Sequence, residues 1–104
     1  MQSSPADTNP VNTGHDVTEP LNPEEIRVLA RIAPHALRSR RTAIQAAIQL
    51  VMLTYRDEDH LERAAITPEG KHTHQRLKQY YRERKAALEA EDAAIRAALK
   101  EAQA

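Results

Sequence analysis

The sequence predicts an all-α protein in which an extended N-terminal arm precedes a helical domain. Apolar residues after position 23 recur at spacings of three, four or seven, which is typical of one face of a helix. Two segments carry the signals of a helix start, and Gly70 is the only glycine after residue 22. We therefore expect a long antiparallel helical hairpin or a three-to-four-helix arrangement, with residues 23–104 as a single α-helical domain.

Residues 1–22 are expected to form an arm without regular secondary structure. They contain three prolines and Gly14, and they show neither a helical nor a strand period. Such a polar segment buries too little apolar surface to offset the entropy lost when it becomes ordered. The simplest molecule to hold it is another protein in a large assembly. Its apolar anchors in a partner's groove are then Val11, Val17 and Leu21.

The first helix is predicted to begin at Asn22 and Pro23. Asn22 can accept a hydrogen bond from the first turn, and Glu25 can reach back to the amide of Asn22. A proline at the first helical position loses no hydrogen bond. Leu21 can pack on Ile26 as a hydrophobic staple.

A helical apolar stripe continues from this start, although Pro34 interrupts it. Its members are Ile26, Leu29, Ala33, Leu37, Ile44, Ile48, Val51 and Tyr55. Proline removes one backbone amide and clashes with the preceding turn. The segment is therefore two helices, at about 23–33 and 35–56, or one helix kinked at Pro34.

An acidic connector follows, and then a long last helix. The connector carries Asp57, Glu58, Asp59 and Glu62, and it has room for a short helix. The sequence Thr67-Pro68-Glu69 repeats the start signal, so the last helix should run over about 68–102. The two helical stretches are nearly equal in length, which favours an antiparallel hairpin. Such a hairpin places Arg27 and Arg31 near Asp92 and Glu101, and the connector near the basic start of the last helix.

The residues before the last helix, Ile66-Thr67-Pro68-Glu69-Gly70-Lys71, are similar to a junction in winged-helix transcription regulators, where the wing meets the dimerisation helix. The wing of that family needs two strands joined by a turn. Residues 57–65 show no strand alternation and no glycine. We carry no function over from this resemblance.

The 15 basic and 15 acidic residues cancel over the chain but are unevenly distributed. Candidate nucleic-acid contacts gather at the start of the last helix, interleaved with His, Gln and Tyr: Lys71, Arg76, Lys78, Arg82 and Lys85. The competing interpretation is that the acidic connector neutralises this patch. A second cluster of arginines at 38, 40 and 41 spreads around its helix, which favours surface salt bridges.

Several classes of function are not expected. The chain has no cysteine, and within the predicted helical domain no histidine and carboxylate pair has the i, i+4 spacing of a shared metal site. It has no glycine-rich phosphate loop and no recognisable Ser-His-Asp arrangement. We therefore expect neither enzymatic activity nor a bound cofactor. No secretory signal is visible, and the longest nearly apolar run is too short to cross a membrane.

These observations favour a non-enzymatic helical adaptor or structural subunit of a multi-protein assembly. A phage or virus particle component is an example, located in the cytoplasm or in a particle assembled inside the cell. The alternative is a small nucleic-acid-binding regulator that uses the basic start of the last helix. A homo-oligomer built on the alanine-rich last helix is a third, weaker hypothesis.

Overall fold

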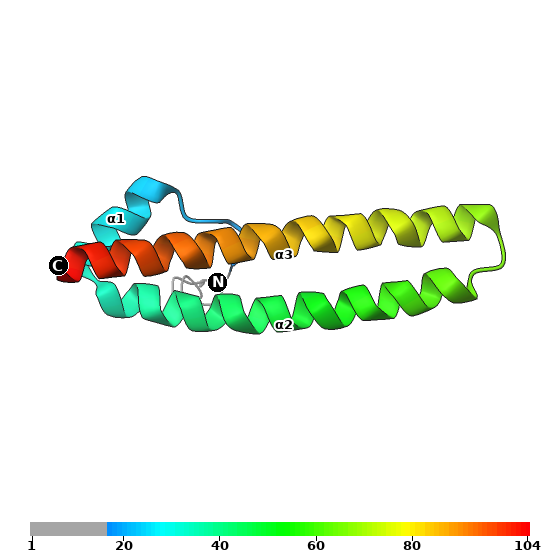
Figure 1. The fold of residues 1–104 in the computed structure, drawn as a ribbon, viewed down its shortest axis with the longest axis horizontal. Helices are drawn as coiled ribbons and strands as arrows, with labels where there is room; N and C mark the ends of the chain where they lie inside the picture. Colours follow the sequence, from blue (N-terminus) through cyan, green and yellow to red (C-terminus); the bar gives the residue numbers. More distant parts are fainter. Residues whose placement is uncertain (1–16) are drawn as a thin grey trace, which may run out of the picture.

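The computed structural model describes residues 17–104, and all the regular secondary structure in this range is helical. The helices are α1 (Pro23–Ile32), α2 (Pro34–Ala64) and α3 (Pro68–Gln103). Figure 1 shows α2 and α3 side by side as a long antiparallel hairpin, with α1 beside the end that holds the C-terminus. The all-α class, the hairpin and the predicted bounds of the last helix are confirmed.

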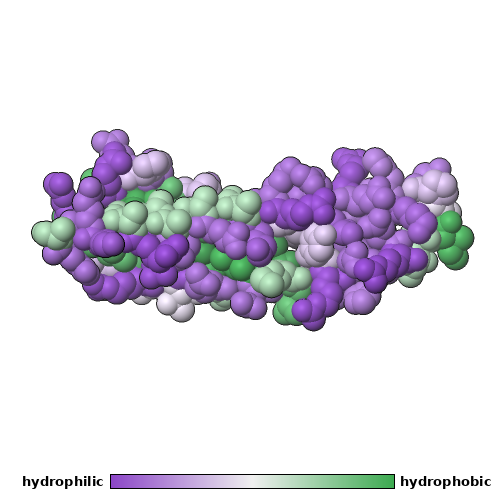
Figure 2. Space-filling view, in the orientation of Figure 1, coloured by the Kyte–Doolittle hydropathy of each residue, from purple (hydrophilic) through white to green (hydrophobic). Residues whose placement is uncertain are grey.

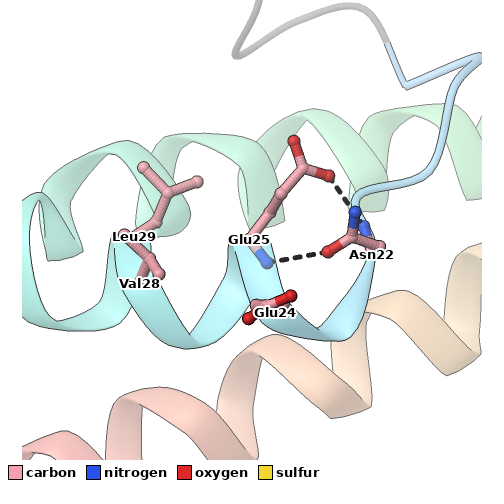
Figure 3. A pocket seen from close by; sticks show the side chains of 5 residues that line it. All are labelled: Asn22, Glu24, Glu25, Val28 and Leu29. Carbon is pink, nitrogen blue, oxygen red and sulfur yellow. Dashed lines mark hydrogen bonds between the residues drawn. The ribbon is translucent and has the colours of Figure 1, made fainter.

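The start of α1 is a reciprocal capping box, as predicted. The Glu25 amide donates to Asn22 Oδ1 at 2.8 Å, and the Asn22 amide donates to Glu25 Oε1 at 3.0 Å (Figure 3). Pro23 occupies the first helical turn, where its missing N–H leaves no carbonyl unpaired. Leu21 packs against the core just before this start.

Pro34 breaks the helix rather than kinking it. Ala33 has φ −151° and ψ 62°, which lies outside the helical region, and its amide closes α1 by donating to the Leu29 carbonyl at 2.8 Å. Pro34 then begins α2 in the position where a proline is tolerated. The break lets α1 fold back to contact both α3 and α2.

The predicted acidic connector is helical: α2 continues to Ala64, and only residues 65–67 join it to α3. Nothing in 57–64 breaks a helix, and three of its carboxylates, those of Glu58, Asp59 and Glu62, contact side chains of α3. Asp59 forms an i, i+4 ion pair with Arg63 at 2.9 Å and a second ion pair with Lys78 of α3 at 2.7 Å. At the start of α3, Thr67 Oγ1 accepts from the Gly70 amide at 3.0 Å.

The hydrophobic core occupies one half of the hairpin. Its buried members are Val17, Ile26, Ala30, Leu37, Ile44, Ile48, Leu88, Ile95 and Leu99. We call residues 17–48 and 86–103 the head, and residues 49–85 the distal hairpin. On the face drawn in Figure 2, hydrophobic residues lie over the head and near the middle of the molecule, and the rest of the distal hairpin is mainly hydrophilic apart from a patch at its tip. The almost fully exposed Ile66 lies in the turn at that tip.

Candidate interaction surface

The helices of the head are joined by a buried ion pair between Arg40 of α2 and Glu91 of α3. Both side chains are only 5% exposed, and the Arg40 Nε–H donates to Glu91 Oε2. The neighbouring pair joins Arg41 Nε to Asp92 Oδ1 at 2.8 Å. From the sequence, these arginines were expected in surface salt bridges, and Asp92 was expected near α1. The buried pair of Arg40 and Glu91 was therefore not predicted.

A sequence signal for the buried pair exists. Arg40 interrupts the apolar stripe between Leu37 and Ile44, and Glu91 interrupts the stripe between Leu88 and Ile95. Opposite charges that break two facing apolar stripes point to a cross-helix pair, since a buried charge needs a partner.

Residues 17–22, which we call the strap, run extended across the head. Arg84 Nη2 donates to the Val17 carbonyl at 2.7 Å, and Arg40 Nη2 donates to the Glu19 carbonyl at 2.7 Å. Val17 is buried, and Leu21 is half-buried against the core. Two of the three predicted partner anchors therefore contact this chain's own core. The third, Val11, lies outside the described residues.

Polar contacts hold the distal hairpin together. Lys78 Nζ contacts Asp59 Oδ1 at 2.7 Å and Glu62 Oε1 at 3.0 Å, and His74 Nδ1 lies 2.6 Å from Glu58 Oε1. We call these five residues the polar seam. Hydrogen bonds to Asp59 and Glu62 raise the pKa of the Lys78 ammonium above its usual range.

The same contacts act on the carboxylates. The hydrogen bond from Lys78 lowers the pKa of Asp59, and hydrogen bonds from Gln75 and then Lys78 lower the pKa of Glu62. All three groups are therefore held in their charged forms at neutral pH.

The predicted nucleic-acid contacts do not form one free patch. Lys78 is neutralised by two carboxylates, Lys85 pairs with Glu89 at 3.0 Å, and the Lys71 ammonium donates to the Glu62 carbonyl. Arg82 donates to Tyr55 Oη at 3.1 Å. Helical spacing places these four on one side of α3 and Arg76 on the opposite side. The expected neutralisation by the acidic residues of α2 is present at Lys78.

A stripe along one side of α2 carries alanines in the head and leucines in the distal hairpin, with Arg40 at its start and Thr54 and Asp57 between the leucines. Positions 40, 43, 47, 50, 54, 57 and 61 alternate in steps of three and four, so they share one side of the helix. In the head, Ala43 and Ala47 of this stripe pack against the core. Farther along, Leu50 is 65% exposed and Leu61 49% exposed, and the adjacent Leu53 is 52% exposed. We call Leu50, Leu53 and Leu61 the open face.

A shallow pocket of about 340 Å³ lies on the outer side of α1. It is lined by Asn22, Glu24, Glu25, Val28 and Leu29 (Figure 3). Asn22 and Glu25 are paired with each other in the capping box, so the main polar groups of this pocket serve the start of the helix.

Comparison with protein-family models, curated proteins and solved structures finds no match for this chain. Over residues 17–104, no group of three or more His, Cys, Asp or Glu side chains is arranged to hold a metal ion. Within the same range, no helix combines the length and apolar character needed to cross a membrane.

Proposed function

We propose that this chain is a non-enzymatic helical adaptor or structural subunit of a larger multi-protein assembly, and that it binds a helix of a neighbouring subunit along the open face. The observation that carries this proposal is that one side of α2 is packed against the core in the head and exposed to solvent in the distal hairpin. In the head, this side packs within the chain's own core. Beyond Ala47 it exposes Leu50 and Leu61, and the exposed Leu53 lies beside it.

Continuity with the head indicates what kind of partner fits. In the head, α1 is a third helix that contacts both α2 and α3, and it ends there. The distal hairpin has only two helices, and a polar seam stands where the head has apolar layers. A partner helix with its own apolar stripe would extend the three-helix packing of the head. Burial of each leucine contributes at most about 1.5–3 kcal/mol, reduced by the fraction already covered.

The N-terminal arm has a separate part in this proposal. Val17 and Leu21 serve the fold of the chain itself, so partner contacts by the arm are left to Val11 and its neighbours. A component of a phage or virus particle is one kind of subunit with this design, by analogy only.

Affinity purification of tagged variants, in the organism that encodes the chain, tests the open face. The variant Leu50→Ser/Leu61→Ser removes apolar surface from it, and Val28→Ser/Ile32→Ser is the matched control on the exposed side of α1. We expect a protein partner that the wild type and the control recover in the presence of nuclease, and that the open-face variant loses. A cross-link from the partner to residues 50–61 should accompany it.

Equal recovery by the open-face variant would contradict the proposal. Recovery that nuclease abolishes would favour the nucleic-acid alternative. A dimer that sedimentation detects in the wild type and not in the open-face variant would assign this face to a second copy of the chain. Removal of residues 1–16 tests the arm separately and leaves the strap in place.

A further inference from the structure

A surface hollow of the distal hairpin lies between α2 and α3, directly beyond the core of the head. This groove has a volume of about 340 Å³. Its lining residues are Val51, Met52, Tyr55 and Arg56 of α2, with Tyr81, Arg82 and Lys85 of α3. Met52 and Arg56 are one turn apart and lie on a different side of α2 from the open face. The groove and the open face are therefore separate surfaces.

The floor of the groove is apolar and aromatic. Val51, Tyr55 and Tyr81 are half-buried in it, and Met52 is 43% exposed at its edge. Methionine is flexible and polarisable, so it adapts to apolar ligands of different shapes. Tyrosine rings offer a large apolar surface with a polar tip. This floor suits an aliphatic or aromatic side chain.

Three cations border the groove, and no carboxylate lines it. Arg82 donates only to neutral oxygens, those of Tyr55 and Gln79, and its guanidinium lies over the Tyr55 ring, 5.8 Å from the centroid. Arg56 forms no ion pair within residues 17–104. Lys85 pairs with Glu89 on the surface, and solvent and salt weaken exposed pairs of this kind. Lys78 differs, because two carboxylates already hold it.

We propose that this groove binds an acidic peptide segment of a partner protein, with one aromatic or large aliphatic side chain inserted between α2 and α3. Arg56, Arg82 and Lys85 would pair with carboxylates on both sides of that side chain. Arginine is well suited to this task, because its planar fork can make two parallel hydrogen bonds to one carboxylate.

The distribution of charge favours a short acidic peptide over nucleic acid. A nucleic-acid strand follows a row of cations that neutralise successive phosphates. Here the cations that line the groove are Arg56, Arg82 and Lys85, and α3 also carries the carboxylates Glu83 and Glu89 next to Arg82 and Lys85 in sequence. Toward the tip, Lys78 forms ion pairs with Asp59 and Glu62. A short peptide fits between these carboxylates.

Fluorescence anisotropy with the full-length chain tests the proposal. The probe is a labelled peptide of about ten residues, rich in Asp and Glu, that carries Trp and Leu on one side of a helix. We expect saturable binding, with amide shifts in the NMR spectrum confined to residues around 51–56 and 81–85. Arg56→Gln should weaken binding about tenfold. Arg56 is exposed and outside any described ion pair, so this variant should keep the fold.

The matched control is Arg27→Gln, the same change of charge on the exposed surface of α1. It should leave the affinity unchanged. Met52→Ala should weaken binding of the Trp-containing probe and leave a probe with Ala in place of Trp and Leu unaffected.

Three results would overturn the inference: equal binding of a peptide with Lys in place of the acidic residues, amide shifts at the open face instead of the groove, or tighter binding of a single-stranded oligonucleotide of the same net charge. Because the open-face variant leaves the groove intact, failure here is distinguishable from failure of the proposed function.

Discussion

At the scale of single residues, the buried pair of Arg40 and Glu91 has the largest energetic consequence. A buried charge is tolerated only with a partner, and the guanidinium of Arg40 also holds the strap through the Glu19 carbonyl. The pair therefore links three segments that are distant in sequence. It also sets the register of α2 against α3, because a slip of either helix would leave both charges unpaired.

The variant Glu91→Leu should destabilise the protein by about 3–5 kcal/mol, because it removes the buried carboxylate that the charge of Arg40 contacts. Urea unfolding followed by circular dichroism measures this loss. The double variant Arg40→Met/Glu91→Leu should recover most of it, since no buried charge remains. A loss below about 1 kcal/mol for Glu91→Leu would show that the pair is hydrated in solution.

The cap at Asn22 should have a smaller and local effect. Asn22→Ala removes the acceptor for the Glu25 amide and should reduce the free energy of unfolding by about 1 kcal/mol. Asn22→Asp keeps an acceptor oxygen and is the matched control. Thermal unfolding of the two variants measures the difference, and equal melting temperatures would contradict the role of the cap.

At the scale of elements, the head and the distal hairpin are held by different forces. In the head, apolar layers bury four side chains almost completely, namely Leu37, Ile44, Leu88 and Ile95. In the distal hairpin, the polar seam joins the same two helices. The two halves should therefore respond differently to pH.

Acid should weaken the distal hairpin. Asp59 and Glu62 have pKa values lowered by their hydrogen bonds, below the usual 3.8 and 4.5. A group with a lowered pKa stabilises the fold above its unfolded value, and the stabilisation is lost as pH falls through the folded value. We expect amide exchange at 57–64 and 71–78 to accelerate relative to the head between pH 5 and pH 2. In the variant Lys78→Met, these amides should already exchange faster at pH 7. Their exchange should accelerate less on acidification than in the wild type.

The strap should be part of the folded domain. Removal of residues 1–16 keeps the buried Val17 and both carbonyl contacts, so it should lower the unfolding free energy less than removal of residues 1–22 does. Removal of residues 1–22 exposes the core beneath Val17 and Leu21 and deletes the Asn22 cap, and it should cost a few kcal/mol. Urea unfolding compares the two truncations, and equal stabilities would contradict the role of the strap.

At the scale of the whole molecule, the chain combines a small three-helix head with a two-helix extension. This shape follows from the lengths of the helices: α3 has 36 residues and spans about 54 Å, whereas α1 has 10 residues and spans about 15 Å. The core continues past the end of α1 to the buried Val17 of the strap, and it ends at Ile48 and Leu88. Surfaces for partners remain on the part that α1 does not reach.

Hydrogen exchange should reveal this division directly. Amides of α2 up to residue 48 and of α3 from residue 88 should exchange through global unfolding. Amides of 52–64 and 70–82 should exchange through local opening at a lower free energy, because few apolar side chains are buried there. Uniform protection along both helices would contradict this prediction.

Much of the fold follows from sequence patterns. The capping box at Asn22, the proline positions and the three-and-four spacing of apolar residues predict the class, the hairpin and most helix ends. The end of α2 was predicted at 56 and lies at Ala64. A run of acidic residues resembles a solvated connector until its partners on α3 are known. The open face was not predicted: Leu50 and Leu61 lie off the predicted apolar stripe, and the sequence does not show whether another segment covers such a second side of a helix.

The sequence by itself determined the helices of this protein, because caps, proline effects and amphipathic periodicity act between residues at most a few positions apart. Only the tertiary structure decided which polar residues are buried, where the core ends and that the strap belongs to the head. These features depend on contacts between distant positions: Arg40 and Glu91 are 51 residues apart, and Arg84 and Val17 are 67 apart. A stripe of leucines looks the same in sequence whether another segment covers it or not, because that cover depends on how far distant segments reach; in the structure, Leu50 and Leu61 remain exposed.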